Sequence, residues 1–202
     1  MALRGKRRRS GQSGLMKIEA VLLTGGTSTR MGQDKAQIEI EGVPIAIRIG
    51  RALQDAGYPV TVLGSNSIEE FSFQPDLEEY QGPLSALSKF WPNAELVFVA
   101  SCDMPLFDAS VVKLLESKIG DADACVPNLE GRLQPTCALY RTTSLQTARE
   151  TIGEGKKSLF AWLEKLKVRE VTEDELRAAG IKRRACLGAN TPEELQALLT
   201  GS

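Results

Sequence analysis

Residues 18–36 of the chain read IEAVLLTGGTSTRMGQDKA, an apolar run followed at once by a loop rich in glycine and hydroxyl groups. The run over residues 18–23 predicts a buried strand. Gly25 and Gly26 would let the backbone approach a phosphate closely, while Arg30 and Lys35 bring positive charge to the same place. An ordinary strand-to-helix turn is the alternative, because Gly, Ser and Thr are common in such turns. The loop matches neither the P-loop nor the Gly-x-Gly-x-x-Gly fingerprint.

Apolar runs alternate with stretches of helical periodicity, which predicts a doubly wound α/β fold, a mostly parallel sheet with helices on both faces. The expected strands are Ile18 to Leu23, Val60 to Leu63, Leu96 to Ala100, Ala124 to Pro127, Gln134 to Tyr140 and Val168 to Val171. The expected helices are Pro44 to Ala56, Pro83 to Phe90, Ala109 to Ile119, Thr143 to Ile152, Ser158 to Leu166 and Pro192 to Leu199. Because such sheets bind ligands beyond the carboxyl ends of their strands, the glycine loop and Asp103 should share one edge.

The composition limits the chemistry that this chain can perform. Its 202 residues include no histidine, which excludes Ser-His-Asp and Cys-His catalysis and nearly all familiar zinc sites. The four cysteines stand singly, so we expect reduced thiols, with Cys102, Cys125 and Cys137 in apolar strand-like runs. A thiol role for Cys102, beside Asp103, is the alternative. The chemistry must therefore use carboxylates, lysines, arginines, backbone dipoles or a hard metal ion.

Residues 1–16 form a basic arm without a single acidic residue, and residues 17–202 are expected to form one domain. The arm is expected to be disordered. We favour an expression remnant or an over-long start before Met16 over a tether for nucleic acid or an acidic surface. The arm lacks the apolar centre of a secretory signal, and no run approaches the ~20 apolar residues of a membrane span. We expect a cytoplasmic protein that binds neither nucleic acid nor membrane.

Asp103 stands where an apolar strand stops and where Pro105 delays the start of the next helix. A carboxylate fixed at this place can bind Mg²⁺, which prefers carboxylate and phosphate oxygens. The alternative is an Asx-turn, in which the side chain accepts backbone N–H groups at a strand end. The residue types and positions alone leave both interpretations open.

Five segments carry a resemblance to a known family. They are the loop Leu23 to Lys35 with its Gly-Gly, Arg-Met-Gly and Asp-Lys elements, Gln81 to Leu84, Ser101 to Leu106, Gln134 to Tyr140, and Asn190 to Leu195. In order and spacing they resemble the molybdenum cofactor guanylyltransferases, the MobA-type nucleotidyltransferases, over nearly the whole chain from Lys17. Thr24 replaces the family's usual Ala. The resemblance implies a Rossmann-like nucleotidyltransferase fold that uses Mg²⁺.

The resemblance also implies roles for individual residues. Catalysis would depend on Lys35, Arg30 and Asp103, and Asp103 would hold the magnesium. Nucleotide binding would involve Leu23, Thr24, Gly25, Gly26, Lys35, Asn66, Asp76, Gly82 and Asp103. In this family the double glycine accompanies guanine, whereas an Ala-Gly version is commoner in cytidylyltransferases. For Asn66 we favour a turn residue over a nucleotide contact. Asp76 is equally explained as a surface turn residue, and the family's aspartate can align with Glu78 or Glu79 in its place.

On the acceptor side, the resemblance implies that Arg132, Gln134, Lys156 and Asn190 face the pterin, with Lys157 beside them. A solvated surface is the alternative for the basic residues, and Asn190 can simply begin the last helix. Ser158 is expected to cap the helix that it precedes. Gly188 stands where the family often has a second asparagine, which leaves that part of the acceptor site undefined.

The implied reaction transfers GMP from GTP to the terminal phosphate of molybdopterin or the molybdenum cofactor and releases pyrophosphate. Molybdoenzymes and other cofactor-biosynthesis proteins are candidate partners. The nearest alternatives are a molybdenum cofactor cytidylyltransferase and a sugar-phosphate nucleotidyltransferase. A nucleotide-binding regulatory module without catalytic activity is the alternative from a different class.

Overall fold

The structure is a computed structural model that describes residues 16–24, 38–75 and 82–201. The glycine loop after Thr24, with Arg30 and Lys35, and the segment holding Asp76 lie outside these residues. The strands are β1 Ile18–Leu23, β2 Glu39–Ile40, β3 Val43–Pro44, β4 Val60–Gly64, β5 Ser72–Pro75, β6 Leu96–Ser101, β7 Ala124–Leu129, β8 Arg132–Leu133, β9 Cys137–Arg141 and β10 Val168–Val171. The helices are α1 Ile45–Asp55, α2 Pro83–Ser88, α3 Ser110–Lys118, α4 Leu145–Gly153, α5 Leu159–Leu163, α6 Glu173–Ala178 and α7 Pro192–Thr200, with 3-10 turns η2 Thr142–Ser144 and η3 Arg183–Cys186.

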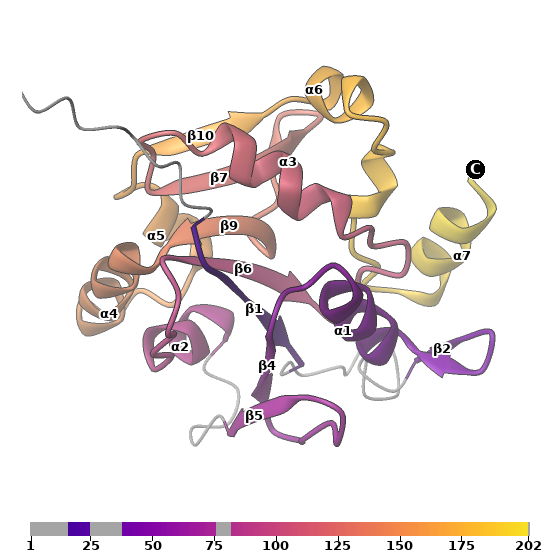
Figure 1. Cartoon of the computed structure of the whole chain (residues 1–202), viewed down its shortest axis with the longest axis horizontal. Helices are drawn as coiled ribbons and strands as arrows, with labels where there is room; N and C mark the ends of the chain where they lie inside the picture. The colour runs from indigo at the N-terminus through magenta and orange to yellow at the C-terminus, as the bar shows by residue number, and fades with distance from the viewer. Residues whose placement is uncertain (1–15, 25–37, 76–81, 202) are drawn as a thin grey trace, which may run out of the picture.

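The central sheet has the strand order β10-β7-β9-β6-β1-β4-β5, with β8 paired to β7 (Figure 1). Neighbours pair in parallel except at β9, which runs antiparallel to both β6 and β7, and at the β7–β8 pair. The expectation of a mostly parallel sheet is confirmed. From β1 the chain proceeds outward to β4 and β5 and then returns to β6 on the other side of β1. This reversal of strand order beside β1 is the place where doubly wound sheets bind ligands.

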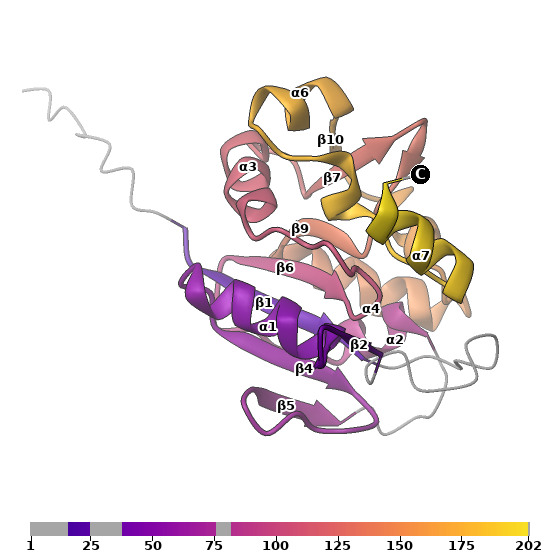
Figure 2. The same ribbon diagram turned by 90° about the vertical axis from the view of Figure 1, so that its right-hand side faces the viewer.

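Helices cover both faces of the sheet, as the alternation of side chains along β1 requires. Ile18, Ala20 and Leu22 pack into one buried cluster with residues of α1, α3 and α6. Val21 and Leu23 point to the opposite face and pack with residues of α2, α4 and α5. Figure 2 shows the sheet between these two groups of helices. Successive residues of a strand alternate between faces, so one strand supports both halves of the core.

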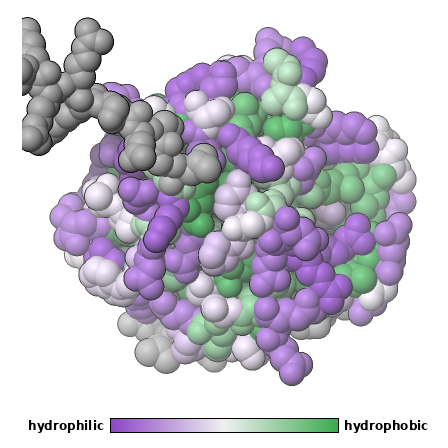
Figure 3. Space-filling view, viewed as in Figure 1, coloured by the Kyte–Doolittle hydropathy of each residue, from purple (hydrophilic) through white to green (hydrophobic). Residues whose placement is uncertain are grey.

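Helix α1 packs on the sheet through one side. Its buried residues recur at helical spacing, and Arg51 on its opposite side forms a bidentate ion pair with Glu70 at 2.7 Å. Gly50 faces the ring of Phe71 so closely that a Cβ there would lie 2.2 Å from Phe71 Cζ. The glycine therefore permits a buried aromatic ring to pack directly on the helix backbone. Figure 3 shows mainly hydrophilic residues over the outer surface on this side.

The structure corrects the expected elements in several places, and the short strands β2, β3, β5 and β8 were not expected. The strand expected from Gln134 begins only at Cys137, because Gln134 to Thr136 form a turn closed by a Cys137 N–H to Gln134 carbonyl bond of 2.9 Å. The helix expected to run to Leu166 ends at Leu163. Helix α6 was not expected, although Thr172 and Glu175 form a capping box at its start. No helix among the described residues is long and apolar enough to cross a membrane.

Candidate active site

The carboxyl ends of β1 and β6 meet at one edge of the sheet. Leu23 lies opposite Ser101 in the parallel register, and the Cys102 N–H donates to the Leu23 carbonyl at 3.1 Å. On the other side of β1, the Thr24 N–H donates to the Leu63 carbonyl at 3.0 Å. Thr24 and Asp103 therefore leave the sheet from adjacent strands. The expectation that the two motifs start from the same edge is confirmed.

Two segments from the second half of the chain meet Asp103 at this edge. Because β9 is antiparallel to β6, its first residue, Cys137, pairs with Ala100 near the last residue of β6, and the Thr136 carbonyl accepts the Ser101 N–H at 3.1 Å. From the other direction, the Ala189 N–H donates to the Asp103 carbonyl at 2.8 Å. The turn before β9 and the segment before α7 are thereby brought to the same place.

A cavity of about 580 Å³ opens among these segments. Its lining includes Asp103, Arg132, Gln134, Lys157, Gly188 and Asn190. Three of the four residues expected at the acceptor, Arg132, Gln134 and Asn190, therefore lie together beside Asp103. Lys156 does not line the cavity: its ammonium lies 3.7 Å from a Glu154 carboxylate oxygen, and the next residue, Lys157, takes the position facing the cavity.

The remaining expected residues surround this region or lie outside the described chain. Asn66 is exposed two residues beyond the end of β4 and does not line the cavity, which agrees with a turn residue. Gly82 precedes α2 with φ +89°, a conformation that favours glycine, and its Cβ position would lie 3.8 Å from the Lys157 carbonyl. Pro83, the first residue of α2, lines the cavity. Gly25, Gly26 and Asp76 fall outside the described residues.

The cavity walls are held by buried hydrogen bonds. The Tyr140 hydroxyl donates to the Pro135 carbonyl at 2.8 Å and thereby supports the turn before β9. The ring of Tyr140 stacks on Trp162 with centroids 4.5 Å apart, and the indole N–H of Trp162 donates to the Ser144 carbonyl at 3.1 Å. Ser158 caps α5 as expected, accepting the Phe160 N–H at 3.2 Å. These bonds fix the cavity wall from within the core.

The entry to α7 fixes the opposite wall. Thr191 is its N-cap and accepts the Glu194 N–H at 3.2 Å, while the Glu194 carboxylate accepts the Asn190 N–H at 2.6 Å. Asn190 therefore contributes its backbone to the start of the helix and still lines the cavity. The position at the start of the helix is confirmed, and contact with the acceptor stays a prediction.

Sequence reasoning missed several residues of the cavity. Phe160 lines it with 52% of its surface exposed, and Arg183 lines it while paired with the carboxylate of Glu130. Arg183 lies in η3, and neither periodicity nor a recognisable motif marks its position in the sequence. Phe160 lies two residues after Ser158, the predicted helix start. The sequence therefore implied its position but did not show that its side chain is exposed.

The cysteines contribute to the core. All four are buried, which confirms the expectation for Cys102, Cys125 and Cys137. Burial raises the pKa of Cys125 to about 12, and a hydrogen bond with Cys186 together with burial raises the pKa of Cys137. Such thiols remain protonated at neutral pH and act as small apolar groups.

The described residues fit one mode of magnesium binding and not another. Among them there is no group of three or more His, Cys, Asp or Glu residues that could form a resident metal site. A single carboxylate such as Asp103 is nevertheless the usual protein contribution to Mg²⁺ that is bound mainly through substrate phosphates. The structure therefore fits a magnesium ion that enters with a nucleotide.

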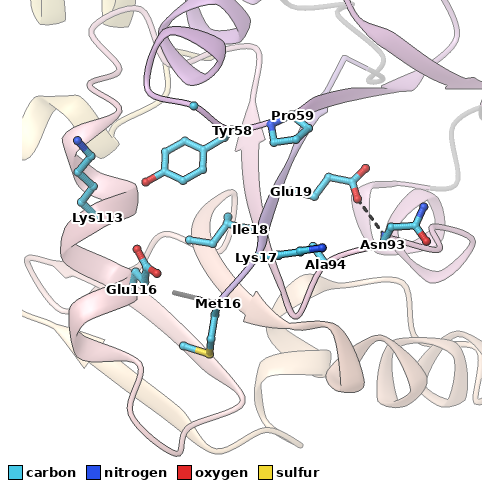
Figure 4. Close-up of a pocket in the computed structure, with 11 residues that line it drawn as sticks. Met16, Lys17, Ile18, Glu19, Tyr58, Pro59, Asn93, Ala94, Lys113 and Glu116 are labelled. Carbon is cyan, nitrogen blue, oxygen red and sulfur yellow. Dashed lines mark hydrogen bonds between the residues drawn. The ribbon is translucent and has the colours of Figure 1, made fainter. Parts of the chain in front are cut away.

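A larger cavity, of about 890 Å³, lies at the opposite edge of the sheet (Figure 4). Met16, Lys17, Tyr58, Lys113 and Glu116 contribute to its lining, and none of the expected site residues does. It adjoins the amino ends of β1, β4 and β6. Doubly wound sheets bind their ligands at the other edge, so cavity size does not identify the active site here.

The chain resembles known proteins over most of its length. Residues 20–171 match the model of the MobA-like NTP transferase domain. A protein of Peptoclostridium acidaminophilum named a probable molybdenum cofactor guanylyltransferase is 30% identical over 191 residues, covering 88% of this chain and 86% of its own. The molybdenum cofactor guanylyltransferase of Desulfosudis oleivorans is 27% identical, covering 89% and 93%.

Solved structures show the same fold. The molybdopterin-guanine dinucleotide biosynthesis protein A of Archaeoglobus fulgidus superposes with a TM-score of 0.75 at 21% identity, covering 89% of this chain and 96% of that one. The sheet topology, the paired ends of β1 and β6 and the domain match agree with one another. This chain belongs to the MobA-like NTP transferase family of nucleotidyltransferases.

Proposed function

We propose that this protein transfers GMP from GTP to the terminal phosphate of molybdopterin or its molybdenum-loaded form, with Mg²⁺ and with release of pyrophosphate. The observation that carries the proposal is the register of β1 and β6, which places Asp103 beside the start of the glycine loop. The names of the curated relatives support guanylyl transfer in particular. Residues 17–202 would form one nucleotidyltransferase domain.

GTP would bind over the end of β1. Asp103 would hold the magnesium ion, while Arg30 and Lys35 would neutralise the triphosphate. Nucleotide contacts are proposed for Leu23, Thr24, Gly25, Gly26, Lys35, Asn66, Asp76, Gly82 and Asp103. The sequence Gly25-Gly26 supports guanine as the base, through the resemblance described above.

The acceptor would occupy the cavity beside Asp103. Arg132, Gln134 and Asn190 are proposed to contact it, and Lys157 replaces Lys156 in this assignment because it faces the cavity. Phe160 offers an exposed aromatic face on which a flat heterocycle can stack. The basic side chains would bind the acceptor's phosphate through charge-assisted hydrogen bonds.

The reaction needs no general base, which suits a chain without histidine. A phosphate monoester has a second pKa near ~6, so at neutral pH the acceptor is already mostly the dianionic nucleophile. Its oxygen attacks the α-phosphorus of GTP, and the bond to the pyrophosphate oxygen breaks. Magnesium supplies positive charge to the phosphates when it is bound. The residues of this chain hold two anions in line and reduce their repulsion.

The test is to incubate the protein with each radiolabelled nucleoside triphosphate, Mg²⁺ and molybdopterin. We expect label from GTP to enter the pterin. Greater incorporation from CTP would favour a cytidylyltransferase, and nucleotide binding without transfer or pyrophosphate release would favour a regulatory module. Omission of Mg²⁺ with added chelator should abolish transfer.

A further inference from the structure

The Asp103 carboxylate occupies the space that a side chain at position 188 would need. A Cβ placed on Gly188 would lie 2.7 Å from Asp103 Oδ1, 2.9 Å from Cγ and 3.1 Å from Oδ2. The φ angle of Gly188 lies outside the left-handed range, unlike that of Gly82 at +89°. The backbone at position 188 therefore allows any residue, and the neighbouring carboxylate is what excludes a side chain.

The segment around Gly188 is fixed against Asp103 on both sides. The Ala189 N–H donates to the Asp103 backbone carbonyl at 2.8 Å, and the Asn190 N–H donates to the Glu194 carboxylate at 2.6 Å. On the amino-terminal side, Cys186 is buried in the core. A side chain added at position 188 would consequently displace the Asp103 carboxylate more easily than it would displace the backbone around Gly188.

We propose that Gly188 is a positioning residue that sets the orientation of the Asp103 carboxylate toward the magnesium–nucleotide complex. This inference rests on the proposed function, in which Asp103 binds that ion. Any side chain at position 188, an asparagine included, would have to move this carboxylate.

The first experiment measures metal binding without turnover. Mn²⁺, which accepts the same oxygen ligands, is titrated by electron paramagnetic resonance into protein saturated with GTP and lacking the pterin acceptor. We expect Gly188→Ala to weaken Mn²⁺ binding by about 10-fold or more, the usual consequence of disturbing a group that orients a metal ligand. GTP affinity measured in chelator should be unchanged. The matched control is Gly153→Ala, since a Cβ at Gly153 meets nothing within 4 Å.

The second experiment tests the contact itself and does not depend on metal binding. Gly188→Ala should lower Tm by about 2–10 °C through steric conflict, and most of this loss should disappear in the Asp103→Ala background. Mn²⁺ binding equal to wild type in Gly188→Ala, with weakened binding in Asp103→Asn, would overturn the inference about Gly188 alone. Wild-type binding in Asp103→Asn would overturn the metal assignment of the proposed function. An equal Tm loss in both backgrounds would show that the carboxylate is not what excludes the side chain.

Discussion

Replacing Asp103 by asparagine should separate the chemistry of this site from its structure. The amide has nearly the size of the carboxylate, so it fits against Gly188, and the backbone bond from Ala189 is untouched. We expect the free energy of unfolding to change by less than about 1 kcal/mol. The charge that would hold magnesium on the triphosphate is lost.

The loss of GMP transfer in Asp103→Asn should be large, because no described neighbour can replace the carboxylate. The other acidic residues of the cavity are engaged: Glu130 pairs with Arg183, and Glu194 accepts the Asn190 N–H at the start of α7. We expect GMP transfer to fall by about 10²-fold or more, which corresponds to about 2.7 kcal/mol of transition-state stabilisation.

The assay follows label from GTP into the pterin over a magnesium titration. The control is Asp121→Asn, the same change at a side chain that is 89% exposed and paired with Lys167 before the start of β7, at the other edge of the sheet. The control should retain wild-type turnover. If Asp103→Asn keeps wild-type turnover at the same magnesium requirement, Asp103 does not hold the metal and the assignment is wrong.

Four further outcomes are expected. GTP with Mg²⁺ should raise Tm more than CTP at equal concentration, and an equal or larger shift with CTP would contradict guanine selectivity. Gly50→Ala should destabilise the protein by about 1–3 kcal/mol in denaturant unfolding, because the ring of Phe71 fills the space of the new methyl group. The pKa of Glu175 is lowered from 4.5 to about 2, and the largest cause is its hydrogen bond with the Thr172 backbone N–H. The stability that Glu175 contributes is therefore complete above pH 4.5 and is lost as pH falls through about 2. Glu175→Gln should make the free energy of unfolding depend less on pH over this range. Tyr140→Phe removes the bond to the turn before β9 and should cost about 1 kcal/mol. It should also raise the KM for the pterin and leave the KM for GTP unchanged.

Most of the fold could be predicted because its strands are apolar runs bounded by clear breaks. The run before Thr24 and the run before Asp103 each end where polar residues begin, so the edge that carries the site follows from the sequence alone. The start of β9 could not be placed in this way. Gln134 and Thr136 are polar and Pro135 has no N–H to donate to a neighbouring strand, so these residues carried a turn signal that the prediction passed over.

The details of the cavity depend on tertiary contacts that a sequence pattern does not contain. Adjacent lysines at 156 and 157 have the same chemistry, and only the geometry before α5 decides that Lys157 faces the cavity. The sequence left the role of Gly188 undefined, because a pattern does not show that the Asp103 carboxylate fills the space beside it. Gly188 and Asp103 lie far apart in the sequence, so their contact could not be predicted from a local pattern.

The antiparallel direction of β9 explains how the proposed acceptor residues reach the site. In a sheet with every strand parallel, the residues before a strand lie at the edge opposite the ligand. Reversal of β9 places its amino end beside the carboxyl end of β6, as the pairing of Cys137 with Ala100 shows. The turn before β9 therefore lies at the same edge as Asp103, and its Gln134 lines the cavity. One reversed strand thus lets the second half of the chain form the acceptor side of a site whose nucleotide side would come from the first.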